Sequence, residues 1–170
     1  PSQGHRGINA LIVEADWDGV VVGTKEDKLG IRSSDTHTIM YNDVKVPKSN
    51  RIGEDGFGFK FAMKVLSGGR IGIAAQALGI AGGAYELAVQ YANERKAFGR
   101  EISKHQAIAF KIADMATEIE AAKLLVYRAA YLKDYHQDYA AASSMAKVYA
   151  SEVAMRHTVE AVQVHGGYGF

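Results

Sequence analysis

Basic, aromatic and amide side chains meet in the segment RKAFGREISKHQ, which runs from Arg95 to Gln106 between two stretches of helical pattern. The guanidinium of Arg95 suits a phosphate, the ring of Phe98 suits a flat group, and the amide of Gln106 suits a polar edge. A structural explanation competes, because Arg95 and Lys96 complement the dipole of a helix C-terminus and Gly99 ends the element. That explanation leaves Phe98 and Gln106 without a reason.

A second candidate is the segment QVHGGYGF, from Gln163 to Phe170, where a helical pattern gives way to glycines. Gly166, Gly167 and Gly169 free the backbone to approach a flat or anionic group, although a glycine-rich turn alone is a weak signal. The segment follows a helix, so it is not the fingerprint of a strand–turn–helix dinucleotide site.

A third candidate is Arg70, which lies among small residues in the helical segment LSGGRIG. An arginine there is either the partner of a buried ion pair or a ligand contact. Gly68 and Gly69 beside it suit the approach of a ligand or of another helix. For the later glycines close packing between helices is the simpler explanation: Gly79, Gly82 and Gly83.

The composition is that of a globular protein, with 170 residues, 48% hydrophobic and 23% charged. A net charge of +1 gives no reason to expect a nucleic-acid partner. There is no cysteine, and neither a metal-ligand cluster nor a Ser–His–acid set is evident, so we predict no metal site. The apolar stretches are interrupted by glycine and look too short to span a bilayer, so we expect no membrane span.

The pattern of apolar residues changes along the chain from that of strands to that of helices. Residues 8–46 have the composition of strands and turns, whereas three helices are predicted over 58–93, 104–133 and 138–164. The second helix has a continuous apolar stripe of Ile108, Ile112, Met115, Ile119, Ala122 and Val126. The predicted fold class is therefore α+β: a partial antiparallel β domain over 1–54, followed by an antiparallel helical bundle over 55–170. The chain looks like a piece of a larger protein.

Several segments together resemble the acyl-CoA dehydrogenase family, most closely its short-chain (butyryl-CoA) members. They are KEDKLGIRSSDT, VKVPKSNRIGEDGFGFKFAM, GGRIGIAAQALGIA, YANERKAFGREISKHQAIAFKIADMA and QVHGGYGF, in the order and spacing of the family. The resemblance implies the second half of the middle β domain and most of the C-terminal helical domain, truncated before its last helices.

The resemblance also implies roles for the candidate residues. In the family, the Arg and Phe of an RxxFG segment reach FAD that is bound mainly to a neighbouring subunit, and a QxxGG segment lies along its adenosine end. The implied FAD-binding residues are Arg95, Phe98, Gln106, Gln163, Val164, His165, Gly166 and Gly167. The implied CoA-binding residues are Ser67, Gly68, Gly69 and Arg70. Ser67 departs from the family, which has an acid at this position.

The implied reaction is α,β-dehydrogenation of a short-chain acyl-CoA to the trans-2-enoyl-CoA, with an electron-transfer flavoprotein as acceptor. The family's catalytic Glu is expected downstream of Phe170, and its minority position is Gly69 here, so the fragment alone is predicted to be inactive. A homotetramer is expected, soluble in the cytoplasm of a bacterium or the mitochondrial matrix of a eukaryote. The alternatives are an acyl-CoA oxidase of the same fold and a non-catalytic helical assembly module.

Overall fold

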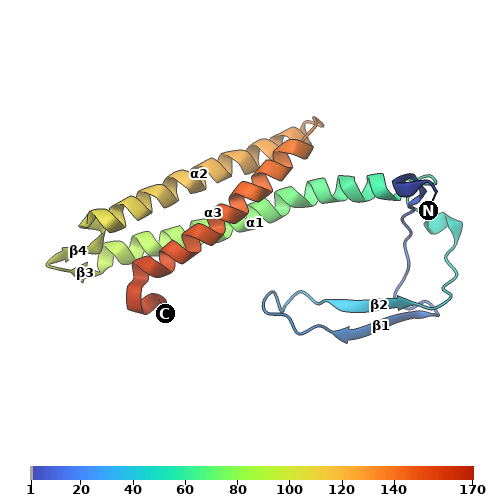
Figure 1. Cartoon of the computed structure of the whole chain (residues 1–170), viewed down its shortest axis with the longest axis horizontal. Helices are drawn as coiled ribbons and strands as arrows, with labels where there is room; N and C mark the ends of the chain where they lie inside the picture. Colours follow the sequence, from blue (N-terminus) through green and yellow to red (C-terminus); the bar gives the residue numbers. More distant parts are fainter. Residues whose placement is uncertain (1) are drawn as a thin grey trace. The chain divides into compact units, whose positions relative to one another are not determined.

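The computed structural model describes residues 2–170, which divide into two compact units with the boundary between Met63 and Lys64. The chain forms three long helices, α1 (Gly58–Glu94), α2 (Gln106–Asp134) and α3 (Ala140–His165), and a small antiparallel sheet (Figure 1). The predicted helices are confirmed to within two residues at each end. The predicted fold class, a partial antiparallel β region followed by a helical bundle, is confirmed as well.

The first unit carries strands β1 (Val20–Lys25) and β2 (His37–Tyr41), which pair antiparallel. Val20 lies opposite Tyr41 and Val22 opposite Ile39, and the register then shifts before Lys25 reaches His37. The unit also contains two short 3-10 turns, η1 (Gly4–Gly7) and η2 (Lys48–Asn50), and the first residues of α1.

The strand-like pattern between Ile8 and Ala15 does not form a named strand, which corrects the prediction for this stretch. Leu11 makes an isolated bridge to Arg51, and the Ile12 N–H donates to the carbonyl of Asn50 at 2.9 Å. The backbone of this stretch therefore bonds to the loop that precedes α1 instead of pairing with β1 or β2.

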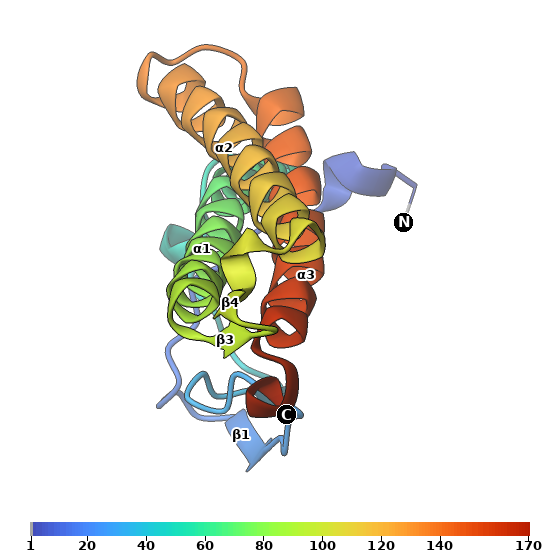
Figure 2. The ribbon, with the colours of Figure 1, turned by 90° about the vertical axis from the view of Figure 1, so that its left-hand side faces the viewer.

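The helices of the second unit pack through a core made largely of alanine (Figures 1 and 2). The main cluster joins all three helices and contains Ala74, Ala81, Ala122, Val126, Ala129, Ala142, Ala146, Ala150, Val153 and Ala154. The predicted stripe of α2 faces this core: Met115, Ala122 and Val126 are buried, and the three isoleucines pack against the buried residues. Helices α1 and α3 cover this stripe, so it is part of the core.

Two ion pairs link α2 to α3. Lys111 pairs with Glu160, and the guanidinium of Arg156 binds Glu118 Oε2 at 2.8–2.9 Å. His157 is only 2% exposed, and its Nε2 lies 2.9 Å from the same oxygen without the alignment of a hydrogen bond.

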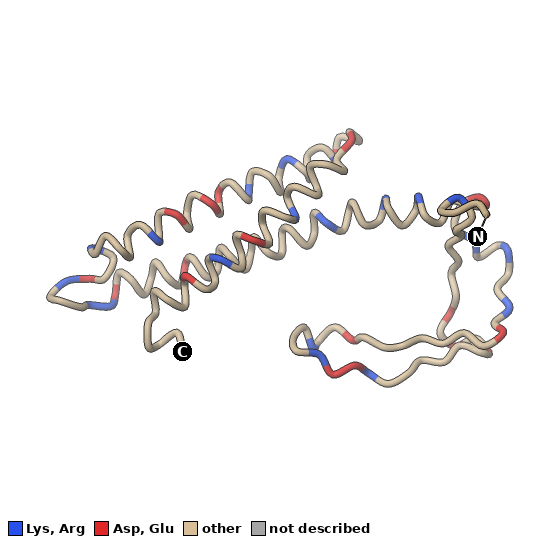
Figure 3. The backbone as a smooth tube through the Cα atoms, in the orientation of Figure 1, with Lys and Arg blue, Asp and Glu red and all other residues tan. Residues whose placement is uncertain are grey.

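One face of α1 remains open in this chain. Four apolar side chains recur every seven residues along it and are half exposed: Leu66, Ile73, Ile80 and Leu87. A Cβ added to Gly79, Gly82 or Gly83 would meet no atom within 4 Å, so the close packing predicted at these glycines is not found within the described chain. Figure 3 shows the charge-free stretch of the helix, between Arg70 and Glu86.

By length and composition alone, α1 could cross a membrane, since an 18-residue window has a mean hydropathy of 1.2. The expectation that the apolar stretches are too short was therefore wrong, because the glycines do not interrupt the helix. Core helices of soluble proteins share this length and composition, so these properties alone do not place α1 in a membrane.

Candidate functional site

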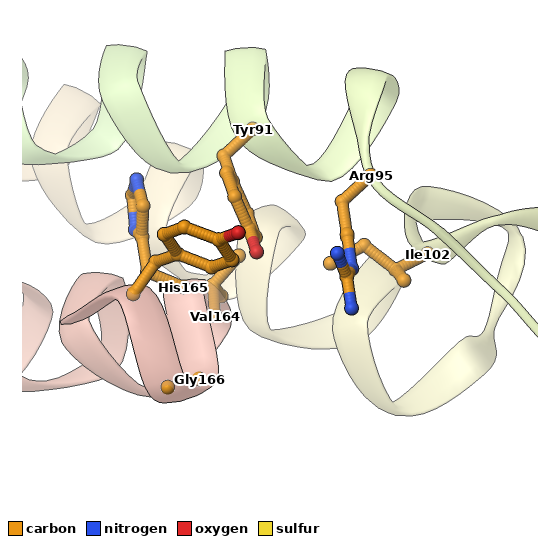
Figure 4. A pocket seen from close by; sticks show the side chains of 8 residues that line it. Tyr91, Arg95, Ile102, Val164, His165 and Gly166 are labelled. Atoms are coloured by element: carbon orange, nitrogen blue, oxygen red, sulfur yellow. The ribbon is translucent and has the colours of Figure 1, made fainter. Parts of the chain in front are cut away.

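A pocket of about 330 Å³ lies between the end of α1, the segment that joins α1 to α2, and the end of α3 with the turn that follows it (Figure 4). It is lined by Tyr91, Arg95, Ile102, Val164, His165, Gly166, Gly167 and Tyr168. Its volume is at the low end of the range for small-molecule sites, about 300–1,000 Å³. The pocket can therefore take part of a dinucleotide but not all of it.

A short hairpin places Arg95 in this pocket. Arg95 follows the last residue of α1, and its N–H donates to the carbonyl of Tyr91 at 2.8 Å. Strands β3 (Lys96–Ala97) and β4 (Arg100–Glu101) then turn the chain back through η3 (Ile102–Lys104). The Ile102 N–H donates to the carbonyl of Arg95 at 2.8 Å, which brings both residues to the same wall.

The hairpin also excludes the explanation that Gly99 ends the helix. Helix α1 ends at Glu94, and Gly99 lies in the hairpin turn with φ of 80°. Gly99 is therefore a turn residue and not the cap of the helix. Positive φ is the conformation that glycine adopts at least cost.

Stacked rings form a second wall. The rings of Tyr91 and His165 stack with centroids 4.5 Å apart at 24°, and both side chains lie in the wall of the pocket (Figure 4). The ring centroid of Tyr168 lies 6.2 Å from that of Tyr91. His165 Nδ1 donates to the carbonyl of Ala161 at 2.8 Å, so the Nε2 of the neutral ring is an acceptor. These contacts hold the start of the glycine turn η4 (Gly166–Gly169) against α1.

The glycines of the η4 turn differ in their surroundings, so glycine is favoured at each for a different reason. A Cβ at Gly169 would lie 2.4 Å from the carbonyl oxygen of Val162, so no larger residue fits there. Gly166 has φ of 57° and, like Gly167, faces open space. The backbone at Gly166 and Gly167 is therefore open to a ligand.

The charge of Arg95 is not balanced by an acid. Among residues 2–170, no carboxylate lies within 4.0 Å of its guanidinium. The nearby Glu101 has a lowered pKa, because it accepts a backbone hydrogen bond and lies 3.6 Å from the ammonium of Lys96. Glu101 thus stays ionised and paired with Lys96, and Arg95 is left to attract an anion.

The structure brings together five of the eight predicted cofactor residues in the pocket: Arg95, Val164, His165, Gly166 and Gly167. The other three do not line it. Phe98 is at the hairpin tip and 97% exposed, Gln106 is the first residue of α2, and Gln163 is exposed in the last turn of α3.

Sequence reasoning missed Tyr91, Ile102 and Tyr168. Tyr91 stands four residues before Arg95, a spacing that puts both on one face of a helix, so its position was a usable signal. Tyr168 offered no such signal, since its contact with Tyr91 joins separate helices.

The predicted substrate residues Ser67, Gly68, Gly69 and Arg70 lie on α1 far from the pocket. Arg70 lies 24 residues before Glu94, the last residue of the helix and the neighbour of Arg95, which is about 36 Å at 1.5 Å per residue. Arg70 Nη1 donates to Ser144 Oγ at 3.4 Å, and no carboxylate within the described residues pairs with it. The buried ion pair that competed with a ligand role is therefore not found.

Residues 56–170 match the family model of the acyl-CoA dehydrogenase C-terminal domain, which is the class that the helical bundle and its end pocket define. The chain belongs to the acyl-CoA dehydrogenase family.

Individual relatives agree with this assignment. The chain is 53% identical over 169 residues to the caffeyl-CoA reductase-Etf complex subunit CarC of Acetobacterium woodii, covering 99% of this chain and 45% of the relative. It is 48% identical to the mitochondrial short-chain specific acyl-CoA dehydrogenase of Mus musculus, and the match covers 99% of this chain and 41% of the relative. The structure of butyryl-CoA dehydrogenase from Megasphaera elsdenii matches with a TM-score of 0.95 at 51% identity, covering 100% of this chain and 44% of that one. The chain thus spans less than half the length of these relatives.

Proposed function

We propose that the protein containing this chain is a flavin-dependent acyl-CoA dehydrogenase, which converts a short-chain acyl-CoA to the trans-2-enoyl-CoA. The observation that carries the proposal is the meeting of Arg95 with the Gly166–Gly167 backbone in one pocket of a chain from this family. Residues 1–54 would be the second half of the middle β domain, and 55–170 most of the C-terminal helical domain.

The residues of the pocket fit a part of FAD. A guanidinium without an acidic partner suits the diphosphate, and a glycine turn without side chains leaves room for a nucleotide. The rings of Tyr91 and Tyr168 offer flat apolar surface beside these polar groups. We assign Arg95 to the diphosphate and Gln163 to Gly167 to the adenosine end.

Two exposed residues complete the assignment. Phe98 would pack on the cofactor, and Gln106 would hydrogen-bond to a polar edge of it. Both side chains project from the end of the bundle, so they reach a cofactor held mainly by a neighbouring subunit. FAD, when bound, supplies the acceptor for the hydride that leaves the β-carbon.

The CoA-binding role falls to Ser67, Gly68, Gly69 and Arg70. The hydroxyl of Ser67 can bond to adenosine or pantetheine, while Arg70 provides a positive charge for phosphate. We assign no catalytic base to this chain, because Gly69 has no side chain and no glutamate lines the pocket among the described residues. The base would be a Glu outside this chain.

The electron partner that we propose is an electron-transfer flavoprotein, and the proposed assembly is a homotetramer. The relative named as a subunit of an Etf complex supports the first. The half-exposed apolar stripe of α1 supports the second, because an apolar face of this kind is usually covered by another surface. The location that we propose is the cytoplasm of a bacterium or the mitochondrial matrix of a eukaryote.

A second candidate is the reverse reaction, reduction of a 2-enoyl-CoA with electrons from an electron-transfer flavoprotein. It is favoured by the 53% identity to a protein that is named a caffeyl-CoA reductase subunit. The same cofactor and CoA sites would serve both directions.

Turnover by the purified intact protein tests these proposals. We expect flavin absorbance and oxidation of butyryl-CoA with an electron-transfer flavoprotein as acceptor. Faster reduction of crotonyl-CoA would favour the reductase, and electron transfer to oxygen alone would favour an oxidase. A colourless protein that does not bind added FAD would overturn all three and leave the assembly module.

A further inference from the structure

The tip of the β3–β4 hairpin has a backbone that is unusual for its residues. Phe98 and Gly99 both have positive φ, 52° and 80°, the pattern of a two-residue type I′ turn. Glycine adopts this conformation readily, whereas a residue with a Cβ does so at a cost in free energy. Because Phe98 is also 97% exposed, neither backbone preference nor burial in this chain explains a phenylalanine there.

The ring of His105 holds the two residues that flank this tip. His105 Nε2 lies 3.1 Å from the carbonyl oxygen of Ala97, and Nδ1 lies 3.2 Å from Nη2 of Arg100. Ala97 and Arg100 are paired across the hairpin. The ring therefore bridges both strands directly below Phe98 and Gly99.

These partners settle the tautomer of His105. A carbonyl only accepts hydrogen bonds, so the proton is on Nε2, which donates to Ala97. A guanidinium only donates, so Nδ1 carries the lone pair that accepts from Arg100. One neutral form satisfies both contacts.

His105 also links the tip to α2. Its ring meets that of Phe98 edge-on, at 6.0 Å and 83°, and Gln106 follows it as the first residue of the helix. A single side chain thus connects the strained aromatic residue, both strands and the helix N-terminus.

We propose that His105 is a positioning residue, which holds Phe98 and Gln106 in the arrangement that meets the flavin cofactor. This inference rests on the proposed function. His105 itself need not touch the cofactor, since it acts through the hairpin.

The affinity of the intact protein for FAD tests this inference. In His105→Leu, which lacks both polar contacts, we expect FAD to bind about 3- to 10-fold more weakly, the effect of losing about one hydrogen bond. In His105→Gln the amide nitrogen replaces Nε2 at the same distance along the side chain, and most of the affinity should return. Lys104→Leu, at an exposed neighbour, is the matched control and should bind as the parent does.

A double-mutant cycle with Phe98→Ala separates the outcomes. We expect Phe98→Ala to weaken FAD binding and His105→Leu to add little further loss in that background. If Phe98→Ala weakens binding and His105→Leu does not, or if their losses simply add, the inference on His105 is overturned while the proposed cofactor contact stands. If Phe98→Ala has no effect, the proposed cofactor contact itself fails.

Thermal unfolding of each variant excludes a merely structural role. The inference would be overturned if His105→Leu lowers the melting temperature and His105→Gln does not restore the affinity for FAD. Should the Leu variant not fold, Arg100→Met removes the donor to Nδ1 alone and is expected to weaken FAD binding about 2-fold. Unchanged binding in that variant would count against His105.

Discussion

Arg95 makes the sharpest distinction between a cofactor contact and a helix-end residue. We expect Arg95→Ala in the intact protein to lose about 1.5–3 kcal/mol of FAD binding free energy, or one to two decades in affinity, since a charge-assisted hydrogen bond is lost. The melting temperature without FAD should change little, because Arg95 has no acidic partner among the described residues. Flavin content after dialysis and thermal unfolding of the apoprotein measure the two effects.

Lys96→Ala is the matched control, because Lys96 is the adjacent basic residue and pairs with Glu101 outside the pocket. It should keep its flavin. An Arg95→Ala protein that retains full flavin, yet unfolds much more readily, would return Arg95 to the helix-end explanation.

Glu101 gives the hairpin a dependence on pH. Its pKa in the folded protein lies below the ordinary value of 4.5, so the folded state binds this proton less readily than the unfolded state. The contribution to stability is therefore present above pH 4.5 and is lost as the pH falls through the lowered pKa. Because Glu101 is exposed to solvent, the contribution is small and screened by salt.

Urea unfolding of the parent and of Glu101→Gln at pH 7 and in acid measures this contribution. We expect the parent to be the more stable at pH 7 and the difference to vanish in acid. A difference that persists in acid would mean that the Gln side chain acts through packing.

At the scale of elements, the helices could be predicted because their apolar residues recur with the period of a helix. The stripe from Ile108 to Val126 faces the core for this reason. The stretch from Ile8 to Ala15 could not, because composition does not say whether a β-rich segment will find a strand or a loop as its partner.

The candidate site divides in the same way. Residue types marked Arg95 and the glycine turn as candidates, and the resemblance to the family gave them their predicted roles. The Tyr91–His165 stack and the His105 bridge were not predicted, because they depend on the way separate elements meet.

The open face of α1 predicts whether replacing one of its glycines raises or lowers the free energy of unfolding. Gly79→Ala should stabilise a helix with nothing packed on it by about 0.5–1 kcal/mol, since glycine is the poorer helix former. If another helix lies against Gly79 in the intact protein, the added methyl must instead destabilise the assembly. We expect destabilisation, measured as a lower midpoint of urea unfolding of the intact protein.

Ala75→Gly is the control, at an exposed position of the same helix. Because Ala75 lies one turn before Gly79 on the same face, the substitution should destabilise by at least the propensity difference, to which the loss of any contact with a neighbour adds. A stabilised Gly79→Ala protein would contradict a neighbour at this face.

At the scale of the molecule, oligomeric state tests both the apolar face and the shared cofactor site. We expect light scattering on the intact protein to give a tetramer, or at least a dimer, because Leu66, Ile73, Ile80 and Leu87 would otherwise remain in water. Ile80→Asp should shift the protein towards smaller species. A flavin-containing monomer would contradict the shared-site proposal.

The ion pairs between α2 and α3 bear on how the bundle finds its alignment. Alanine methyl groups are nearly interchangeable, so an interface built on them discriminates poorly between the native alignment and one slipped by seven residues. The slip would bring Lys111 level with Val153 in place of Glu160, and Glu118 level with Tyr149 in place of Arg156. Charges left against apolar neighbours are costly. The ion pairs thus contribute less to stability than to specificity. They disfavour bundles in which α2 and α3 pack in a shifted register, which the alanine core alone would tolerate.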